Sequence, residues 1–295
     1  LKAREITVSV DGGHLAVNSG ATLTTGSLLL NANSNLDAGL GAPATGGTAL
    51  VQVNGNLTLD GTLNVTDIGG FGAGIYRLID YTGGLTNNGL LLGSLPVNIP
   101  ASDLDLQTAI GNQINLLVNG STNVQFWDGS QTTGNGTIEG GSGTWSAGGS
   151  QWTGVNGAFN TAWTPNSFAV FQGTAGTVTV DGAQAVTGLQ FVTDGYNLAG
   201  GAAGALTLFN GVGGNTAVRV DPGVTATLGV ALNGGGTLAK LDTGTLVLNG
   251  ANSYTGGTAL DGGTLVVGND SALGSGVLTT ANGTTLDSNT AVSLA

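Results

Sequence analysis

The chain contains no cysteine and no methionine, and it has a single histidine among its 295 residues. The lack of cysteine excludes a disulfide framework, a thiolate nucleophile and thiolate metal ligands. The one histidine, His14, lies at a turn in the motif DGGHLAV and has no second histidine with which to share a metal ion. We therefore expect a surface histidine there, and neither a metal site nor a Ser-His-Asp triad.

Positive charge is also scarce, and the formal net charge is -12. The five cationic residues are scattered along the chain: Lys2, Arg4, Arg77, Arg219 and Lys240. Binding to nucleic acid requires basic side chains clustered on one surface, and so does binding to an anionic membrane. We expect neither as a partner of this chain.

Long hydrophobic runs and helical patterns are missing as well. No run approaches eighteen consecutive apolar residues, and the opening sequence LKAREITVSV lacks the apolar core of a signal peptide. Because the chain begins in a strand-like segment, we interpret it as a fragment of a longer protein. Residues 104–118 come nearest to a helical pattern, but Gly111, Ile114 and Val118 weaken it.

Glycine, in contrast, is abundant, with 56 residues. Disorder is not expected, because 40% of the residues are hydrophobic and only 7% are charged. Short segments alternate between apolar and polar residues from end to end, such as ITVSV at 6–10, TVTV at 177–180 and TLVL at 245–248. Alternation with a period of two predicts strands, so we predict an all-β fold.

Asp-Gly or Asn-Gly occurs fifteen times, often where a strand pattern ends. These pairs turn the chain easily, either in antiparallel hairpins or at the corners of a solenoid. Gly244, Gly263 and Gly283 each open a Gly-Thr step, at intervals of nineteen and twenty residues, which is typical of stacked coils. We therefore predict a β-solenoid in which Leu246, Leu265 and similar positions stack in apolar columns, with threonine and asparagine in polar ladders.

Two stretches depart from this rhythm and divide the chain. We predict coils over residues 1–125 with a side excursion at 67–100, then an excursion or module boundary at 126–172, then coils again over 173–295. The second stretch holds all four tryptophans, which are Trp127, Trp145, Trp152 and Trp163. Two interpretations remain open for these rings: they cover one end of the hydrophobic column, or they anchor a protein or sugar interface.

Residues 234–288 resemble the passenger-associated transport repeat of bacterial autotransporters. The matching positions are Leu238, Lys240, Gly244, Leu246, Leu248, Gly250, Asn252, Tyr254, Gly256, Thr258, Gly263 and Leu265. The resemblance implies a right-handed parallel β-helix with side excursions, exported through the outer membrane by a C-terminal membrane barrel. It also implies a bacterial cell-surface or extracellular location, and a role for the repeat in folding and export.

The sequence offers little for catalysis. Asp103 and Asp105 form the closest carboxylate pair, and six other aspartates are explained as Asp-Gly corners. The stretch GNGTIEGG has Glu139 where a dinucleotide fingerprint needs glycine, and residues 210–218 lack the aspartate of a calcium-binding repeat. We assign no catalytic, metal or cofactor-binding residue and expect no cofactor and no enzymatic activity.

We therefore expect a monomeric passenger, secreted by the type V route, that acts in adhesion or virulence. Its partner would be a host cell-surface or extracellular-matrix component, although the sequence does not assign the residues that bind it. One alternative is a purely structural stalk and folding platform for an effector further upstream. Another is a β-helix enzyme that acts on polysaccharides, for which Asp103 and Asp105 would be the residues to test.

Overall fold

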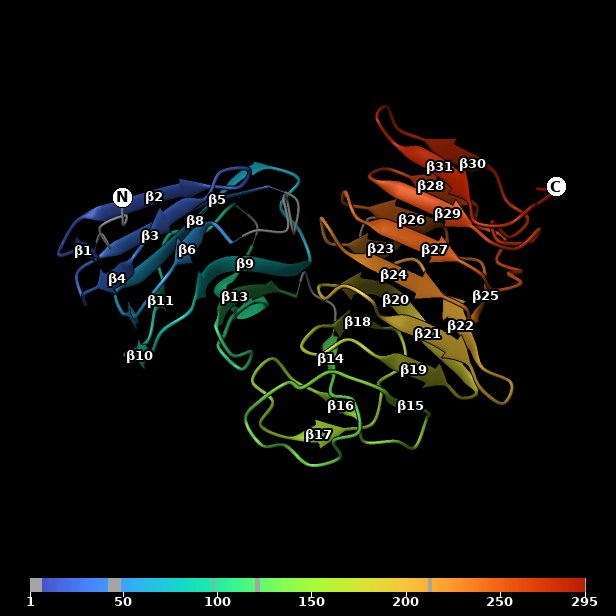
Figure 1. The fold of residues 1–295 in the computed structure, drawn as a ribbon, viewed down its shortest axis with the longest axis horizontal. Coiled ribbons are helices and arrows are strands. Elements are labelled where there is room, and N and C mark those ends of the chain that lie inside the picture. Colours follow the sequence, from blue (N-terminus) through green and yellow to red (C-terminus); the bar gives the residue numbers. More distant parts are fainter. Residues whose placement is uncertain (1–6, 42–48, 98, 120–122, 212–213, 295) are drawn as a thin grey trace, which may run out of the picture. The chain divides into compact units, whose positions relative to one another are not determined.

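The chain folds into strands joined by turns (Figure 1). The computed structural model describes residues 7–41, 49–97, 99–119, 123–211 and 214–294. Within these ranges there is one short 3₁₀ helix, η1 (Ala101–Asp103), and no α-helix, so the all-β prediction is confirmed. None of the described residues belongs to a helix that is long and apolar enough to cross a membrane. The chain divides into two compact units, unit 1 (Leu1–Gly120) and unit 2 (Ser121–Ala295).

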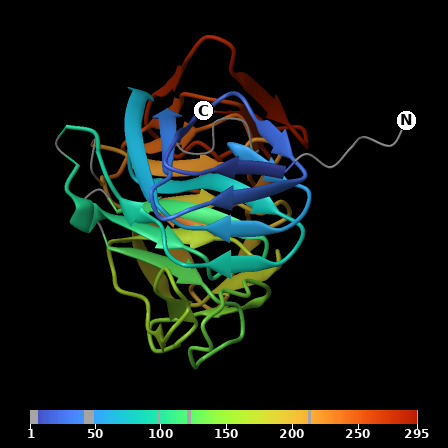
Figure 2. The same ribbon diagram turned by 90° about the vertical axis from the view of Figure 1, so that its left-hand side faces the viewer.

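Unit 1 is built from three sheets, and the chain visits them in turn as it winds through each coil (Figure 2). The first sheet contains β1 (Thr7–Val10), β4 (Ser27–Leu30), β7 (Leu57–Leu59) and β10 (Leu85–Asn87). The second contains β2 (His14–Asn18), β5 (Asn35–Gly41), β8 (Thr62–Gly69) and β11 (Leu91–Leu92). The third contains β3 (Leu23–Thr25), β6 (Val51–Val53), β9 (Gly74–Tyr81), β13 (Gln113–Val118) and β12 (Leu104–Gln107).

The strands of the first two sheets pair in parallel, as expected when successive coils stack. The third sheet ends differently, because β13 lies antiparallel to β9 and β12 lies antiparallel to β13. This hairpin occupies the edge that a further coil would otherwise pair with. Residues 67–100 supply β9 to the third sheet and β10 and β11 to the other two, so much of this stretch belongs to the coils.

Unit 2 contains two sheets that run the length of the unit. The first contains β17 (Asn160–Thr161), β16 (Trp152–Thr153), β14 (Val124–Trp127), β18 (Ser167–Phe171), β20 (Ala183–Phe191), β23 (Thr216–Val220), β26 (Leu238–Leu241), β28 (Thr258–Leu260) and β30 (Leu278–Thr280), with β22 (Ala205–Leu208) and β25 (Ala231–Asn233) branching from β20. The second contains β15 (Gly143–Trp145), β19 (Thr177–Val180), β21 (Asn197–Gly200), β24 (Thr225–Leu228), β27 (Thr245–Leu248), β29 (Thr264–Val267) and β31 (Thr285–Ser288).

The spacing of the Gly-Thr steps is the spacing of the last coils of unit 2. Thr245 pairs with Thr264, which confirms the predicted step of nineteen residues. Thr264 then pairs with Thr285, one position later than the predicted step of twenty, because the turn at Asn282 and Gly283 takes up an additional residue. The unit is therefore a stack of parallel, solenoid-like coils.

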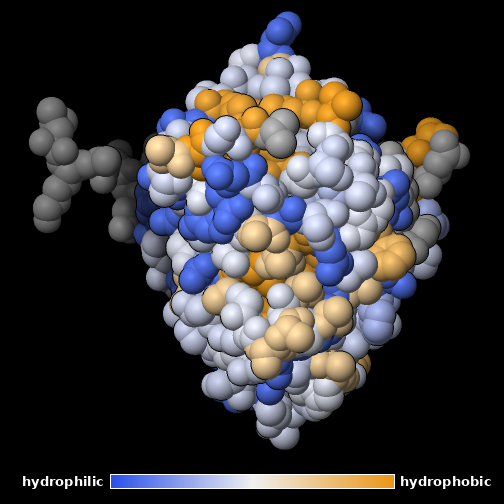
Figure 3. All heavy atoms as spheres, turned by 90° about the vertical axis from the view of Figure 1, so that its right-hand side faces the viewer, coloured by the Kyte–Doolittle hydropathy of each residue, from blue (hydrophilic) through white to orange (hydrophobic). Residues whose placement is uncertain are grey.

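The sequence also predicts correctly which side chains fill the coils. Leu246 pairs with Leu265, and both are fully buried, as are Leu248 and Leu260. On the outer face of the same strands, threonine recurs in register on four coils, which confirms a polar ladder: Thr225, Thr245, Thr264 and Thr285. Figure 3 shows pale and orange surface between the blue groups on one side of unit 2, as expected for a chain with few charged residues.

The corners depend on glycine where two coils touch. Gly263 has a φ of 64°, in the left-handed region, and a Cβ atom added to it would overlap the carbonyl oxygen of Gly244 on the preceding coil. Any other residue at this corner would meet both backbone strain and a steric clash. The same glycine that marks the repeat in the sequence thus allows successive coils to approach each other.

Candidate functional site

The lone histidine lies on the surface, as predicted. His14 is the first residue of β2, and its Nδ1 lies 2.7 Å from Asp37 Oδ2 on the next coil. Asn64, one coil further on, donates a hydrogen bond from Nδ2 to Asp37 Oδ1 at 2.7 Å. Burial alone would raise the pKa of Asp37, but the hydrogen bonds from Asn64 and His14 lower it. The arrangement is a polar ladder, and no group of three His, Cys, Asp or Glu residues suited to a metal ion occurs among the described residues.

The carboxylate pair at Asp103 and Asp105 also lies near the surface. Asp103 ends η1, and Asp105 lies on β12, where it accepts a hydrogen bond from Asn119 Nδ2 at 3.3 Å. Asp105 is exposed and Asp103 is half-buried. No lysine or arginine lies between Arg77 and Arg219 in the sequence, so neither residue has a cationic neighbour close to it along the chain.

The four tryptophans form one buried cluster at the start of the core of unit 2. Trp152 lies at its centre, with ring centroids 4.5 Å from Trp163, 4.7 Å from Trp145 and 5.3 Å from Trp127. All four rings are at most 4% exposed and belong to the same apolar core as the leucine columns of the coils. The interpretation that these rings cover one end of the column is confirmed, and they do not form an exposed binding surface.

Two of the rings also donate hydrogen bonds to the surrounding backbone. Trp127 Nε1 donates to the carbonyl oxygen of Gly141 at 2.8 Å, and Trp163 Nε1 donates to that of Ala185 at 3.1 Å. The Nε1 atoms of Trp145 and Trp152 are buried without a partner in the part of the chain that the structure describes. Shape and burial, more than hydrogen bonding, therefore hold the cluster together.

Asp128 organises the loops outside this cluster, which the sequence did not indicate. Its carboxylate is fully buried and accepts hydrogen bonds from the backbone N–H of Glu139 at 2.8 Å and from Asn160 Nδ2 at 2.9 Å. Asn160 also donates to the carbonyl oxygen of Gln131 at 3.1 Å. We interpreted Asp128 as the first residue of an Asp-Gly corner, which explains Gly129 (φ 64°) but not the burial of the acid.

The pKa values of Asp128 and Glu139 are shifted in opposite directions. Burial, followed by the hydrogen bond and the charge of Glu139, raises the pKa of Asp128 to about 6, against the opposing hydrogen bond from Asn160. Burial would also raise the pKa of Glu139, but hydrogen bonds from Thr137, Asn135 and Asp128 lower it. Below about pH 6, Asp128 is thus the member of the pair that keeps its proton, whereas Glu139 is already ionised.

Replacing Asp128 with asparagine should remove a pH dependence of stability. Because the native chain holds this proton more tightly than the unfolded chain between about pH 4 and pH 6, its stabilisation is complete below about pH 4 and is lost as the pH rises through about 6. Asparagine mimics the protonated acid at every pH. The free energy of unfolding of Asp128→Asn should therefore rise, relative to wild type, by about 1 to 2 kcal/mol between pH 4 and pH 7, a value reduced for solvent screening.

Urea unfolding followed by circular dichroism across this pH range measures the difference. Thr133→Ala, an exposed residue of the same loops, serves as the matched control and should show the pH profile of the wild type. A constant offset between Asp128→Asn and wild type at every pH would contradict the raised pKa of Asp128.

Lys240 is the second buried charged residue whose structural role composition alone does not reveal. It pairs with Val218 and Leu260 in an inward-facing column and is fully buried. Its Nζ donates to three carbonyl oxygens at a corner of two coils, those of Leu241 at 2.9 Å, Asp242 at 2.8 Å and Gly262 at 3.0 Å. The signal in the sequence was the alternation in LAKL, which places the lysine on the same face as Leu238.

Burial of this ammonium group shifts its pKa. Burial lowers the pKa of Lys240 to about 8, opposed by the attraction of Asp242. The group therefore remains largely protonated at neutral pH and can keep donating to the three carbonyls. This lysine holds together the corner of the segment that resembles the transport repeat.

Comparison with known proteins also finds the transport repeat in this segment. The family model for the passenger-associated-transport-repeat matches residues 238–267, inside the stretch 234–288 where we expected it. The chain is also 45% identical over 287 residues to the "Adhesin BmaC autotransporter" of Brucella suis biovar 1 (strain 1330). The chain is part of an autotransporter passenger.

The match to the Brucella protein covers 90% of this passenger chain but only 8% of that protein's length. No solved structure matches the passenger chain. As an autotransporter passenger, it is exported through the outer membrane to the cell surface. Within the passenger chain, the residues of the transport repeat have structural roles. Lys240 and Gly263 form the corners of the coils, and the leucines form the buried columns.

Proposed function

We propose that this passenger chain takes part in adhesion to a host cell-surface or extracellular-matrix component. The observation that carries the proposal is the 45% identity to a protein named as an adhesin over most of the chain. A stack of coils supports it, because such a fold presents a long surface on a rigid frame and leaves its loops free to vary. The passenger is proposed to act as a monomer joined to a C-terminal membrane barrel in the full-length protein.

Purified passenger chain should bind cultured epithelial cells or immobilised matrix proteins in a saturable manner. Binding is measured with fluorescently labelled chain, and unlabelled chain should compete for the same sites. An unrelated β-solenoid of similar size and net charge is the control for non-specific attachment. Binding no stronger than that of the control would contradict an adhesive role for this segment.

The second candidate is a stalk that helps the passenger fold and leave the cell. It is favoured by the transport repeat itself, whose matching residues build the core and the corners of the coils. This role is compatible with adhesion, since one segment of a solenoid can support another. We also propose that the coils wind in the right-handed sense implied by the resemblance.

An enzymatic role is the least supported of the three. The relative is named as an adhesin, and the two carboxylates that came closest to a catalytic pair, Asp103 and Asp105, are not enclosed by a buried site. A polysaccharide-active site would need an acid and a base held at a defined separation around the substrate. We propose no catalytic residue for this chain.

A further inference from the structure

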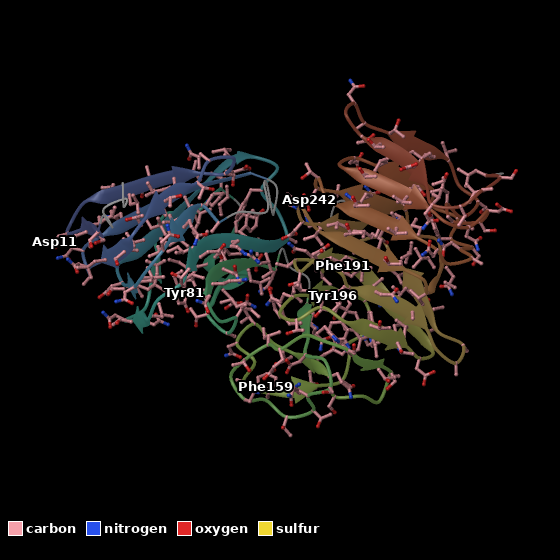
Figure 4. All side chains as sticks on the ribbon, in the orientation of Figure 1. Asp11, Tyr81, Phe159, Phe191, Tyr196 and Asp242 are labelled. Atoms are coloured by element: carbon pink, nitrogen blue, oxygen red, sulfur yellow. The ribbon has the colours of Figure 1, made fainter. Side chains whose placement is uncertain are left out.

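Phe159 is the most exposed aromatic side chain among the described residues, at 64%. It ends the loop between β16 and β17, which we call the Phe159 loop (residues 154–159). Figure 4 shows it at the outer end of unit 2, away from Tyr196 and Phe191, which lie among packed side chains. An exposed phenylalanine leaves apolar surface in contact with water. Binding of a partner over the ring buries this surface, which is favourable.

Hydrogen bonding and close backbone packing hold the Phe159 loop in place. Thr153, which is fully buried, donates a hydrogen bond from Oγ1 to the carbonyl oxygen of Phe159 at 2.8 Å. A Cβ atom at Gly134 would overlap Ala158 and the nitrogen of Phe159, so the neighbouring loop packs directly against this backbone.

A second contact joins the same two loops. The backbone N–H groups of Asn135 and Gly136 both donate to the carbonyl oxygen of Gly157, at 3.1 and 3.0 Å. A ring presented on a fixed backbone loses little conformational entropy when it binds. The Phe159 loop is therefore prepared for contact before a partner arrives.

The charge around the loop limits the kind of partner that fits. The only cationic residues in the sequence of unit 2 are Arg219 and Lys240, and both are buried. Acidic residues of the same unit, such as Asp194 and Asp261, are exposed, and Glu139 on the neighbouring loop is half-buried. Hydrogen bonds lower the pKa of Glu139 and keep it ionised at neutral pH. A positively charged partner is attracted to this region, and an anionic one is repelled.

We propose that the Phe159 loop is the contact point for a positively charged protein surface that offers an apolar pocket to the phenylalanine ring. A lysine or arginine of the partner beside the ring would add a cation–π contact. The inference rests on the proposed adhesive function and names the part of the chain that performs it. A lipid bilayer could also bind an exposed phenylalanine. The negative charge of the chain disfavours binding to bilayers of anionic lipid.

The experiment measures binding of the purified chain to cultured epithelial cells for four proteins: wild type, Phe159→Ala, Phe159→Trp and Phe209→Ala. Phe159→Ala should weaken binding about tenfold, since an aromatic anchor contributes strongly to an interface. Phe159→Trp should retain binding. Phe209→Ala is the matched control, because Phe209 is an exposed phenylalanine (46%) of the same unit that lies at a corner, and it should bind as wild type does. Binding should also weaken as sodium chloride is raised.

The outcomes separate the two proposals. If the wild-type chain does not bind, the adhesive function fails. If it binds and Phe159→Ala binds equally well, or if binding does not change with salt, this inference is overturned while adhesion stands. Binding of wild type to protein-free phosphatidylcholine vesicles, lost in Phe159→Ala, would assign the ring to lipid and overturn the proposal as well. Circular dichroism should show all four proteins equally folded.

Discussion

Replacing Trp152 with alanine should lower the free energy of unfolding of unit 2 by about 4 kcal/mol. The indole ring contacts all three other tryptophans and also lies 5.8 Å from Phe171, centroid to centroid. It is fully buried at the start of a column that continues through the coils. Alanine would leave a cavity that these rings cannot fill without losing their contacts with one another.

The measurement is denaturant unfolding of the whole chain followed by far-UV circular dichroism, because the substitution alters tryptophan fluorescence. Phe209→Ala is the control and should cost less than about 1 kcal/mol, since its ring is exposed in the native chain. Trp152→Phe should recover part of the loss. A loss below about 1 kcal/mol for Trp152→Ala would show that the cluster does not stabilise the unit.

Replacing Lys240 with methionine should destabilise unit 2 by about 3 kcal/mol. Methionine has nearly the same length, but it donates no hydrogen bond, so three carbonyl oxygens at the corner lose their donor. A buried acceptor without a donor costs roughly 1 to 3 kcal/mol. Methionine also avoids the free-energy cost of burying the ammonium charge. The expected destabilisation is therefore smaller than the sum of the costs for three unsatisfied carbonyl oxygens.

Two measurements check the lysine prediction. Denaturant unfolding gives the change in stability, and Thr243→Ala, an exposed residue of the same corner, is the control and should unfold as wild type does. Display of the full-length protein on the bacterial surface should fall for Lys240→Met and not for Thr243→Ala, if the repeat supports folding outside the cell. A Lys240→Met chain as stable as wild type would mean that water or a rearranged backbone satisfies the three carbonyls.

The repeating part of the fold followed from local patterns. Alternation with a period of two identified strands such as TLVL, and the interval from Gly244 to Gly263 equals the coil step observed between Thr245 and Thr264. Both patterns are visible in the sequence because a solenoid residue packs against its equivalents on adjacent coils. The step at Gly283 was missed by one residue, since turn length is not encoded in the strand pattern.

The two buried charged residues, Asp128 in the loops and Lys240 in the coils, were harder to find. Lys240 lies at an inward position of an alternating segment and at a matching position of the repeat, whereas the sequence marked Asp128 only as an Asp-Gly corner. What makes them important is contact with distant residues: Asn160 lies thirty-two positions after Asp128, and Gly262 lies twenty-two after Lys240. Separations like these in loops and corners have no period, and a sequence pattern cannot reveal them.

The sequence by itself determined that this chain is all-β, that its C-terminal coils repeat about every twenty residues, and that it belongs with autotransporter passengers. These properties follow from short-range alternation, from glycine at corners and from a repeat in which the same residues recur. Only the tertiary structure decided that the tryptophans are buried while Phe159 is exposed, because burial depends on which loops fold over a ring. Aromatic residues in a glycine-rich stretch are equally compatible with a core and with a contact surface until the packing around them is known.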